Sequence, residues 1–254
     1  ICDREEEINA FIPEEYWTLD AKLHVHGSRK KLTAHYYGDK DGRKAIHSKE
    51  EVEALMKRLE GCEYEVRDVK LGERVKKAPI PFTTSTLQQE ASKTLNFSTQ
   101  KTMRLAQQLY EGVDIKGRGT IGLITYLRTD STRIAAEADE AARSYIGDQF
   151  GASYVSEAPA AAKSDAKIQD AHEAIRPTDI TLTPVQVKEQ LSRDQFRLYQ
   201  LIWKRFTASR MQPAVYTTTS VKVAAGDYLF TLAASKLSFD GFMSVYVQED
   251  DKEA

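Results

Sequence analysis

The chain has 254 residues, 41% of them hydrophobic and 29% charged, and a formal net charge of −2. This length allows one or two domains with buried cores, and the near balance of charges argues against a protein that coats nucleic acid with a uniformly basic surface. Two widely separated cysteines, Cys2 and Cys62, do not indicate a disulfide framework. There is no run of about 18 apolar residues and the amino terminus is acidic, unlike a signal sequence, so we expect a cytosolic protein with no membrane contact.

The first eighty residues predict strands, one hairpin and one helix. Apolar and polar residues alternate over 17–25, which is the pattern of a half-buried strand. Residues 38–42 contain two glycines and two aspartates and predict a hairpin turn. A serine cap and a terminating glycine delimit a predicted helix over 48–61. Short strands are predicted at 64–66 and 69–71, and two nearby prolines mark a domain boundary.

The middle of the chain predicts mainly helices. Four helix starts are indicated by residues that commonly cap helices, namely Ser98, Asp130 or Ser131, Thr183 and Ser192. The second of these starts would place Tyr126 just before a helix amino terminus, where free N–H groups and a partial positive charge suit a phosphate. Residues 151–167 are rich in Ala and Ser and are interpreted as a mobile loop.

The carboxyl-terminal part predicts strands again. Residues 216–224 and 228–234 flank a Gly-Asp pair and predict a second hairpin. Two strand-rich ends around a helical middle indicate an α+β fold. We expect a discontinuous strand-rich domain, made of 1–82 and 213–254, with a mainly helical domain, 83–212, inserted in it.

The segment around Tyr126 carries the clearest chemical signal. A short apolar run leads to this tyrosine, and Arg128 and Arg133 follow it in a polar stretch. A phenol is a weak nucleophile because its pKa is near 10, but a guanidinium favours the phenolate and can hold a phosphate oxygen. The pair therefore suits covalent attack on a phosphodiester. The alternative is a half-buried ring beside a surface charge, which is what most Tyr-x-Arg triplets are.

The longer string over 124–133, Ile-Thr-Tyr-Leu-Arg-Thr-Asp-Ser-Thr-Arg, closely resembles the active-site segment of the type IA DNA topoisomerases, the bacterial topoisomerase I family. Four further segments resemble parts of this family in the same order. They are 3–17, like the entry into its arch-forming domain; 82–91, like the start of its tyrosine-bearing domain; 170–178, like its histidine segment; and 198–206, like the helix leading back out.

The resemblance implies a strand-rich arch, a helical domain that carries the nucleophile, and a reaction. Tyr126 would cleave single-stranded DNA through a 5′-phosphotyrosyl link, a second strand or duplex would pass, and religation would relax negative supercoils without ATP. The family binds Mg²⁺ through an acidic cluster in an amino-terminal TOPRIM domain. We expect that domain to be missing from this chain, because Asp39-Lys-Asp41 is interpreted as a turn and the acidic residues at 249–253 as a polar tail. The chain would then be a fragment that alone does not relax DNA.

The resemblance also suggests roles for individual residues. Tyr126 and Arg128 would be catalytic, with Arg128 holding the attacked phosphate, while His172, Arg133 and Arg176 would bind DNA and no metal ligand would lie in the chain. Each has a plainer alternative: His172 could be structural, Arg133 a solvated charge, and Arg176, which precedes a proline, the end of a helix. Asp130 is expected to be a helix cap, or else to pair with an arginine.

We further expect a bacterial cytoplasmic, nucleoid-associated monomer whose partners are single-stranded and duplex DNA. The competing hypothesis is a non-catalytic module that binds single-stranded DNA at the gate. Tyrosine recombinases also use Tyr, Arg and His, but in them the tyrosine follows the other residues, whereas Tyr126 precedes His172.

Overall fold

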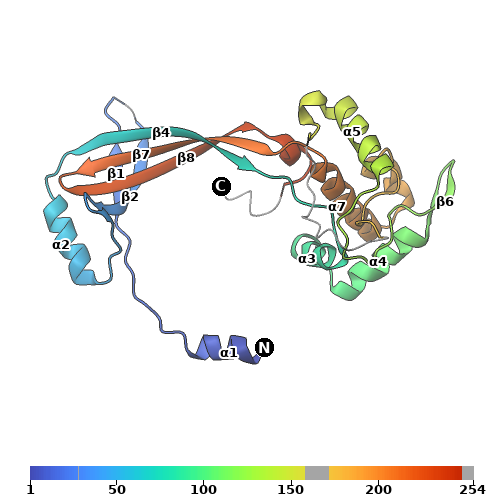
Figure 1. The fold of residues 1–254 in the computed structure, drawn as a ribbon, viewed down its shortest axis with the longest axis horizontal. Helices are drawn as coiled ribbons and strands as arrows, with labels where there is room; N and C mark the ends of the chain where they lie inside the picture. Colours follow the sequence, from blue (N-terminus) through green and yellow to red (C-terminus); the bar gives the residue numbers. More distant parts are fainter. Residues whose placement is uncertain (28, 158–171, 248–254) are drawn as a thin grey trace. The chain divides into compact units, whose positions relative to one another are not determined.

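The structure, a computed structural model, describes residues 1–27, 29–157 and 172–247. It has an α+β fold, as predicted, with one large antiparallel sheet and a group of helices (Figure 1). The chain divides into two compact units. The first consists of residues 1–74 and 217–236, and the second of residues 75–216 and 237–254. The domain limits expected near residues 82 and 212 remain a prediction.

The large sheet has the strand order β1-β2-β8-β7-β4, and β3 pairs with β2. Its strands are β1 (Asp20–His24), β2 (Lys31–Asp39), β3 (Gly42–Arg43), β4 (Tyr64–Lys76), β7 (Ala214–Ala225) and β8 (Tyr228–Phe239). Both predicted hairpins are present. Gly38 and Asp39 pair with Arg43 and Gly42, and β7 and β8 are joined by the two residues 226–227.

The first unit adds two helices, α1 (Cys2–Asn9) and α2 (Lys49–Leu59). Ser48 caps α2 by accepting a hydrogen bond from the backbone N–H of Glu51, as predicted, whereas the Glu51 carboxylate bonds to the backbone of His47. A small buried cluster joins α2 to strands β2, β7 and β8. It consists of Ala34, Leu59, Val223, Ala225 and Phe230. The prediction of two separate strands at 64–66 and 69–71 is wrong in one respect, since both ranges belong to the single strand β4.

The second unit contains most of the helices and the larger core. Its helices are α3 (Thr84–Leu95), α4 (Thr99–Glu111), α5 (Ala136–Phe150), α6 (Pro184–Val187) and α7 (Arg193–Ser209). Its remaining elements are the β5–β6 pair (Val113–Ile115 and Gly119–Ile121) and three 3-10 turns, η1 (Ala152–Tyr154), η2 (Lys188–Gln190) and η3 (Gly241–Ser244). The predicted caps at Ser98, Thr183 and Ser192 are confirmed.

Helix α7 is the centre of this core and contacts α3, α4 and α6. Its aromatic face, Tyr199, Trp203 and Phe206, is buried, as expected for core residues. The polar atoms of the first two are satisfied: Tyr199 Oη donates to the carbonyl of Leu182 at 2.7 Å, and Trp203 Nε1 to that of Ile180 at 2.9 Å. Burying each such ring stabilises the unit by about 1.5–3 kcal/mol.

The helix start predicted at Asp130 or Ser131 is wrong. Helix α5 begins at Ala136 with Ala135 as its N-cap, so Tyr126 lies ten residues before it and not at its amino terminus. The hydroxyls of Thr129 and Ser131 accept hydrogen bonds from backbone N–H groups two residues further on, at 3.0 and 3.2 Å. Such local bonds hold the backbone in turns and compete with a helix.

A loop is predicted at 151–167, after α5. Residues 152–154 form η1, and residues 158–167 lie outside the described part of the chain.

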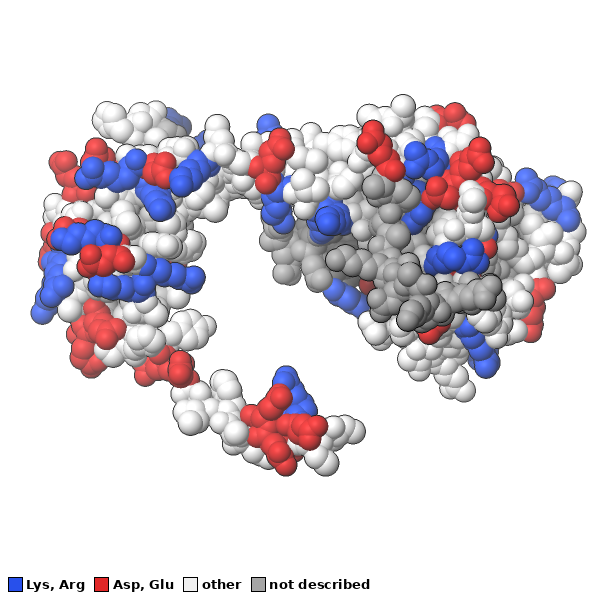
Figure 2. Space-filling model, viewed as in Figure 1, with Lys and Arg blue, Asp and Glu red and all other residues white. Residues whose placement is uncertain are grey.

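Basic and acidic side chains are interspersed over both units on the face drawn in Figure 2, in keeping with the near-neutral composition. No described helix is long and apolar enough to cross a membrane.

Candidate active site

The segment 125–135 that follows β6 has neither helix nor strand, and its residues alternate between the core and the surface. Leu127, Thr129 and Ser131 are buried, whereas Tyr126, Arg128 and Asp130 are exposed. Tyr126 and Arg128 are therefore both on the solvent side of the segment. Tyr126 is 41% exposed, so a macromolecular substrate can reach this residue.

Thr84, the first residue of α3, holds this segment in place. Its hydroxyl donates to the carbonyl of Leu127 at 2.7 Å and accepts from the backbone N–H of Thr129 at 2.9 Å. Its own backbone N–H donates to the carbonyl of Thr129 at 2.9 Å. The helix amino terminus beside Arg128 is therefore that of α3 and not that of α5. Its partial positive charge favours an anion at this place.

The Tyr126 ring lies between two other rings. It meets Tyr110 of α4 edge-on, with centroids 5.6 Å apart, and it stacks on His172 with centroids 5.8 Å apart and an interplanar angle of 27°. These contacts restrict the ring, although the residue remains partly exposed. The structure thus brings together a tyrosine and a histidine that are 46 positions apart in the sequence.

Arg128 and His172 also share a pocket. It has a volume of about 470 Å³, and its walls are formed by Thr84, Ser85, Gln88, Arg128, Thr129, Asp130 and His172. The guanidinium of Arg128, the imidazole of His172, the hydroxyl of Ser85 and the amide of Gln88 line it, and these groups can donate hydrogen bonds. The Thr84 hydroxyl also lines it but donates to the carbonyl of Leu127, and a single carboxylate, Asp130, is present. The pocket is therefore suited to a phosphate group.

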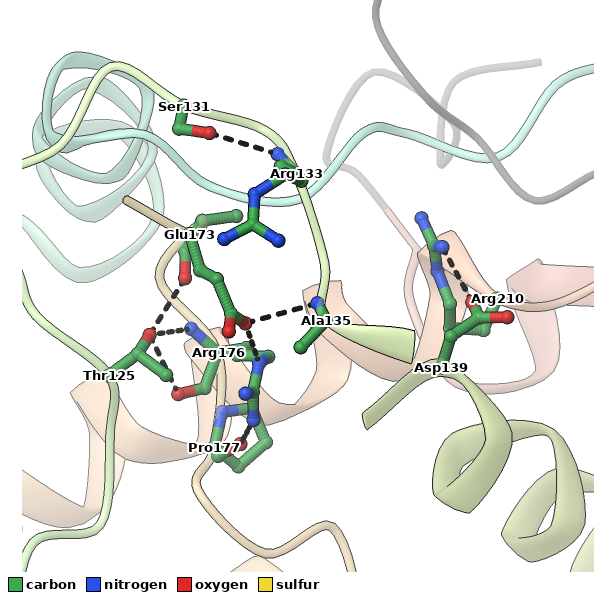
Figure 3. Close-up of polar contacts among 10 residues, drawn as sticks. Thr125, Ser131, Arg133, Ala135, Asp139, Glu173, Arg176, Pro177 and Arg210 are labelled. Atoms are coloured by element: carbon green, nitrogen blue, oxygen red, sulfur yellow. Dashed lines mark hydrogen bonds and ion pairs between the residues drawn. The ribbon is translucent and has the colours of Figure 1, made fainter. Parts of the chain in front are cut away.

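Backbone hydrogen bonds fix the segment that carries His172. Ala174 and Ile175 donate their N–H groups to the carbonyls of Arg133 and Phe82, at 2.9 and 2.8 Å. The Thr125 hydroxyl donates to the carbonyl of Ala174 at 2.7 Å and lies 3.0 Å from the backbone nitrogen of Arg176 (Figure 3). Since Thr125 immediately precedes Tyr126, the same contacts position the tyrosine against the histidine segment.

Two comparisons identify the family of this fold and site. The family model described as "DNA topoisomerase" matches residues 1–254. The chain belongs to the DNA topoisomerase family. It is also similar to the full-length topoisomerase I of Thermotoga maritima, at 40% sequence identity with a TM-score of 0.75. That match covers 98% of this chain and 39% of the Thermotoga chain. The resemblance on which the sequence analysis relied is thereby confirmed.

The two remaining candidates, Arg133 and Arg176, lie in a separate cluster around Glu173 (Figure 3). Arg176 Nε donates to Glu173 Oε2 at 2.7 Å, and its Nη1 donates to the carbonyl of Pro177 at 3.1 Å. The Arg176 side chain is only 12% exposed. It does not close a helix, since Ile175 and Pro177 form bridges with Phe82 and Ile124. A DNA contact by Arg176 would require this ion pair to open.

Glu173 is the acceptor that unites this cluster. Its carboxylate also accepts the N–H of Ala135, the N-cap of α5, at 3.3 Å. Burial alone would raise the pKa of Glu173, but the hydrogen bond and charge of Arg176, together with the Ala135 N–H and the charge of Arg133, outweigh it and lower the pKa. The ionised carboxylate therefore stabilises the folded state above the ordinary pKa of a glutamate.

We expect this contribution to disappear in acid. As the pH falls below about 4.5 and through the lowered pKa, Glu173 gains a proton, and the bonds to Arg176 and Ala135 weaken. The protection factor of the Ala135 amide against hydrogen exchange, which is the intrinsic rate divided by the observed rate, should fall in this range. Glu173→Gln should destabilise the second unit by about 1–3 kcal/mol at neutral pH and abolish the acid step. An unchanged acid step in Glu173→Gln would assign it to another carboxylate.

The described residues do not offer a metal site. Among them, no three side chains of His, Cys, Asp or Glu gather closely enough to hold a metal ion. The Asp39–Asp41 pair lies at the tight turn between β2 and β3, where Asp39 bonds to Lys44 and to the backbone of Asp41. Residues 249–253 are outside the described part of the chain. Residues for the Mg²⁺ that the family implies are therefore not found in this set.

Sequence reasoning overlooked the residues of α3 and α4 that complete the site. Thr84, Ser85 and Gln88 lie in the string 82–91, whose resemblance to a family segment assigns them no individual role, and Tyr110 follows the predicted helix start at Ser98 without a signal of its own. The bonds of Thr84 to Leu127 and Thr129 join residues more than 40 positions apart, so no local pattern reveals them.

Proposed function

We propose that this chain carries the nucleophile and the phosphate-binding groups of a type IA topoisomerase. Tyr126 attacks a phosphodiester of single-stranded DNA and forms a 5′-phosphotyrosyl link. The observation that carries the proposal is the exposed Tyr126 ring, which stacks on His172, while His172 lines one pocket together with Arg128. Family membership supports the same reaction class.

The covalent step has a simple balance. The phenolic oxygen of Tyr126 forms a bond to phosphorus as the bond from phosphorus to the 3′ oxygen breaks. The phenol loses a proton and the released 3′ oxygen gains one. Arg128 holds the non-bridging oxygens and stabilises the negative charge that develops on them. Because the phosphodiester is conserved as a phosphotyrosyl ester, the 3′ hydroxyl can reverse the attack without ATP.

The other residues position the DNA. His172 binds and aligns the strand next to Tyr126, and the amino terminus of α3 adds a fixed partial positive charge. Strand passage follows when the strand-rich arch allows the tyrosine-bearing unit to swing away. The Mg²⁺ of the family belongs, in this proposal, to a TOPRIM domain outside these residues. The partners are single-stranded and duplex DNA, and the enzyme acts as a monomer in the bacterial cytoplasm.

Binding of DNA by the chain alone is the first test. We expect the 254-residue chain to bind single-stranded oligonucleotides weakly and in a salt-dependent manner, because Arg128 and its neighbours contact phosphates. A plot of log affinity against log salt should have a slope of about −0.7 per phosphate contact. A slope near zero would mean that phosphate contacts are not the basis of binding. We also expect the chain alone not to relax supercoiled DNA.

The competing hypothesis, a non-catalytic gate module, predicts the same binding but a different product. In a full-length enzyme that carries these residues, it predicts no protein attached to the 5′ end of cleaved DNA. The type IA proposal predicts that attachment, which can be detected by denaturing electrophoresis of an oligonucleotide labelled at its 3′ end.

A further inference from the structure

A second hollow lies along α3, next to the pocket that contains Arg128 and His172. It has a volume of about 480 Å³ and is lined by Ser85, Gln88, Gln89, Ser92, Lys93 and Thr99. Ser85 and Gln88 also belong to the walls of the pocket that contains Arg128 and His172. The two hollows therefore share walls along α3, and together they are here called the α3 groove. It starts at Arg128 and ends at Lys93.

The groove follows one face of the helix. Positions 85, 88, 89 and 92 have the i, i+3, i+4, i+7 spacing that brings side chains to the same side. The opposite face, with Leu87 and Ala91, is buried in the core. Over seven residues an α-helix advances about 10 Å, which corresponds to about three nucleotide rises along the axis of a B-form helix. The face is therefore long enough for more than one nucleotide of a bound strand.

The chemistry of the lining fits a sugar–phosphate backbone. Hydroxyls and amides dominate, Lys93 lies at one end, and Arg128 lies at the other together with Asp130 and His172. Glu90 also belongs to α3, but it does not line the groove and interacts with Tyr246, which belongs to the core cluster. The hollow between Ser85 and Lys93 has no aromatic side chain among its lining residues, so bases have no stacking platform in that part of the groove. Contacts of this kind bind a strand regardless of its sequence.

We propose that the α3 groove binds the DNA strand that becomes attached to Tyr126, on the 3′ side of the cleaved phosphate. The assignment to this side rests on the proposed 5′-phosphotyrosyl link. Tyr126 and the groove belong to the same compact unit, so a strand captured by the tyrosine stays beside the groove when the gate opens. The groove would then hold the captured end in register for religation.

The test is a charge change at the end of the groove remote from Arg128. In a full-length enzyme that carries these residues, Gln89→Glu/Ser92→Glu places two carboxylates against the phosphates. We expect the affinity for an oligonucleotide that extends several nucleotides beyond the cleavage site on its 3′ side to fall about tenfold, because binding of this kind depends on phosphate neutralisation. Affinity for an oligonucleotide that extends only on the 5′ side should be unchanged.

The control is Gln149→Glu, which makes one Gln→Glu change at an exposed position of α5 in the same unit. It should bind both oligonucleotides like the unmodified enzyme. Lys93→Ala provides an independent variant that adds no negative charge: it should lower the slope of log affinity against log salt by about 0.7 for the 3′-extended oligonucleotide alone. Thermal unfolding of every variant shows whether it is folded.

The outcomes separate the two proposals. If folded groove variants bind the 3′-extended oligonucleotide as tightly as the control, the groove proposal is wrong, whether or not the phosphotyrosyl link forms. Equal loss for both oligonucleotides, or a loss on the 5′ side alone, would also overturn it. If the unmodified enzyme forms no link to a 5′ end, the proposed function is wrong, while the affinity measurements still decide whether the groove binds DNA.

Discussion

Replacing Tyr126 by Phe should abolish covalent attachment to DNA without unfolding the protein. The substitution keeps the ring that stacks on His172 and packs against Tyr110, and removes only the oxygen that would attack phosphorus. Since the side chain is 41% exposed, the free energy of unfolding should change by no more than about 0.5 kcal/mol. The measurement is the yield of protein-linked DNA in a single-turnover cleavage assay.

Tyr110→Phe is the matched control. Tyr110 is 39% exposed, carries the same functional group and lies against Tyr126. Its variant should form the covalent link at close to the normal rate. If the Tyr126→Phe enzyme still yields protein-linked 5′ ends, another residue is the nucleophile, and loss of the link in Tyr110→Phe alone would identify that residue.

The elements that sequence reasoning found correctly are those with local causes. Ser98 and Ser192 each accept a hydrogen bond from a backbone N–H three residues away, so the signal and the contact lie within one helical turn. The hairpin between β7 and β8 has Gly226 at φ 59°, a conformation that glycine adopts at little steric cost. Tyr199, Trp203 and Phe206 lie on one buried face of α7 because their spacing matches the period of a helix.

The error before α5 has a non-local cause. Residues 130–135 have a helix-like pattern, but Thr84 holds Thr129 from a position 45 residues away, and Glu173 bonds to the Ala135 N–H from 38 residues away. These contacts hold the segment out of a helical conformation, and α5 begins only at Ala136. The same cause explains why the sequence could suggest Tyr126, Arg128 and His172 singly, but could not show which of them share a pocket. Thr84 and Thr125, which hold the segments together, were missed for the same reason.

The Arg128→Lys substitution should slow DNA cleavage by about 30- to 1000-fold. Lysine keeps the charge but replaces a planar fork of donors by a single ammonium. If Arg128 grips two phosphate oxygens in the transition state, the loss should be about 2–4 kcal/mol, the range for removing one preorganised donor. DNA affinity should change much less, because a contact that strengthens only in the transition state affects the chemical step selectively.

Arg133→Lys is the control for this experiment. Arg133 is also exposed and lies close in the sequence, but its charge acts on Glu173 and it is not among the residues lining the pocket. The same substitution there should leave the single-turnover cleavage rate within about threefold of the unmodified enzyme, as for a surface change away from the reacting phosphate. If Arg128→Lys also stays within about threefold, the guanidinium does not form a transition-state contact, and Arg128 acts only as a supporting charge. A rate loss that is large for Arg128→Lys and small for Arg133→Lys would instead attribute phosphate recognition to the donor geometry at Arg128, since both variants keep the positive charge.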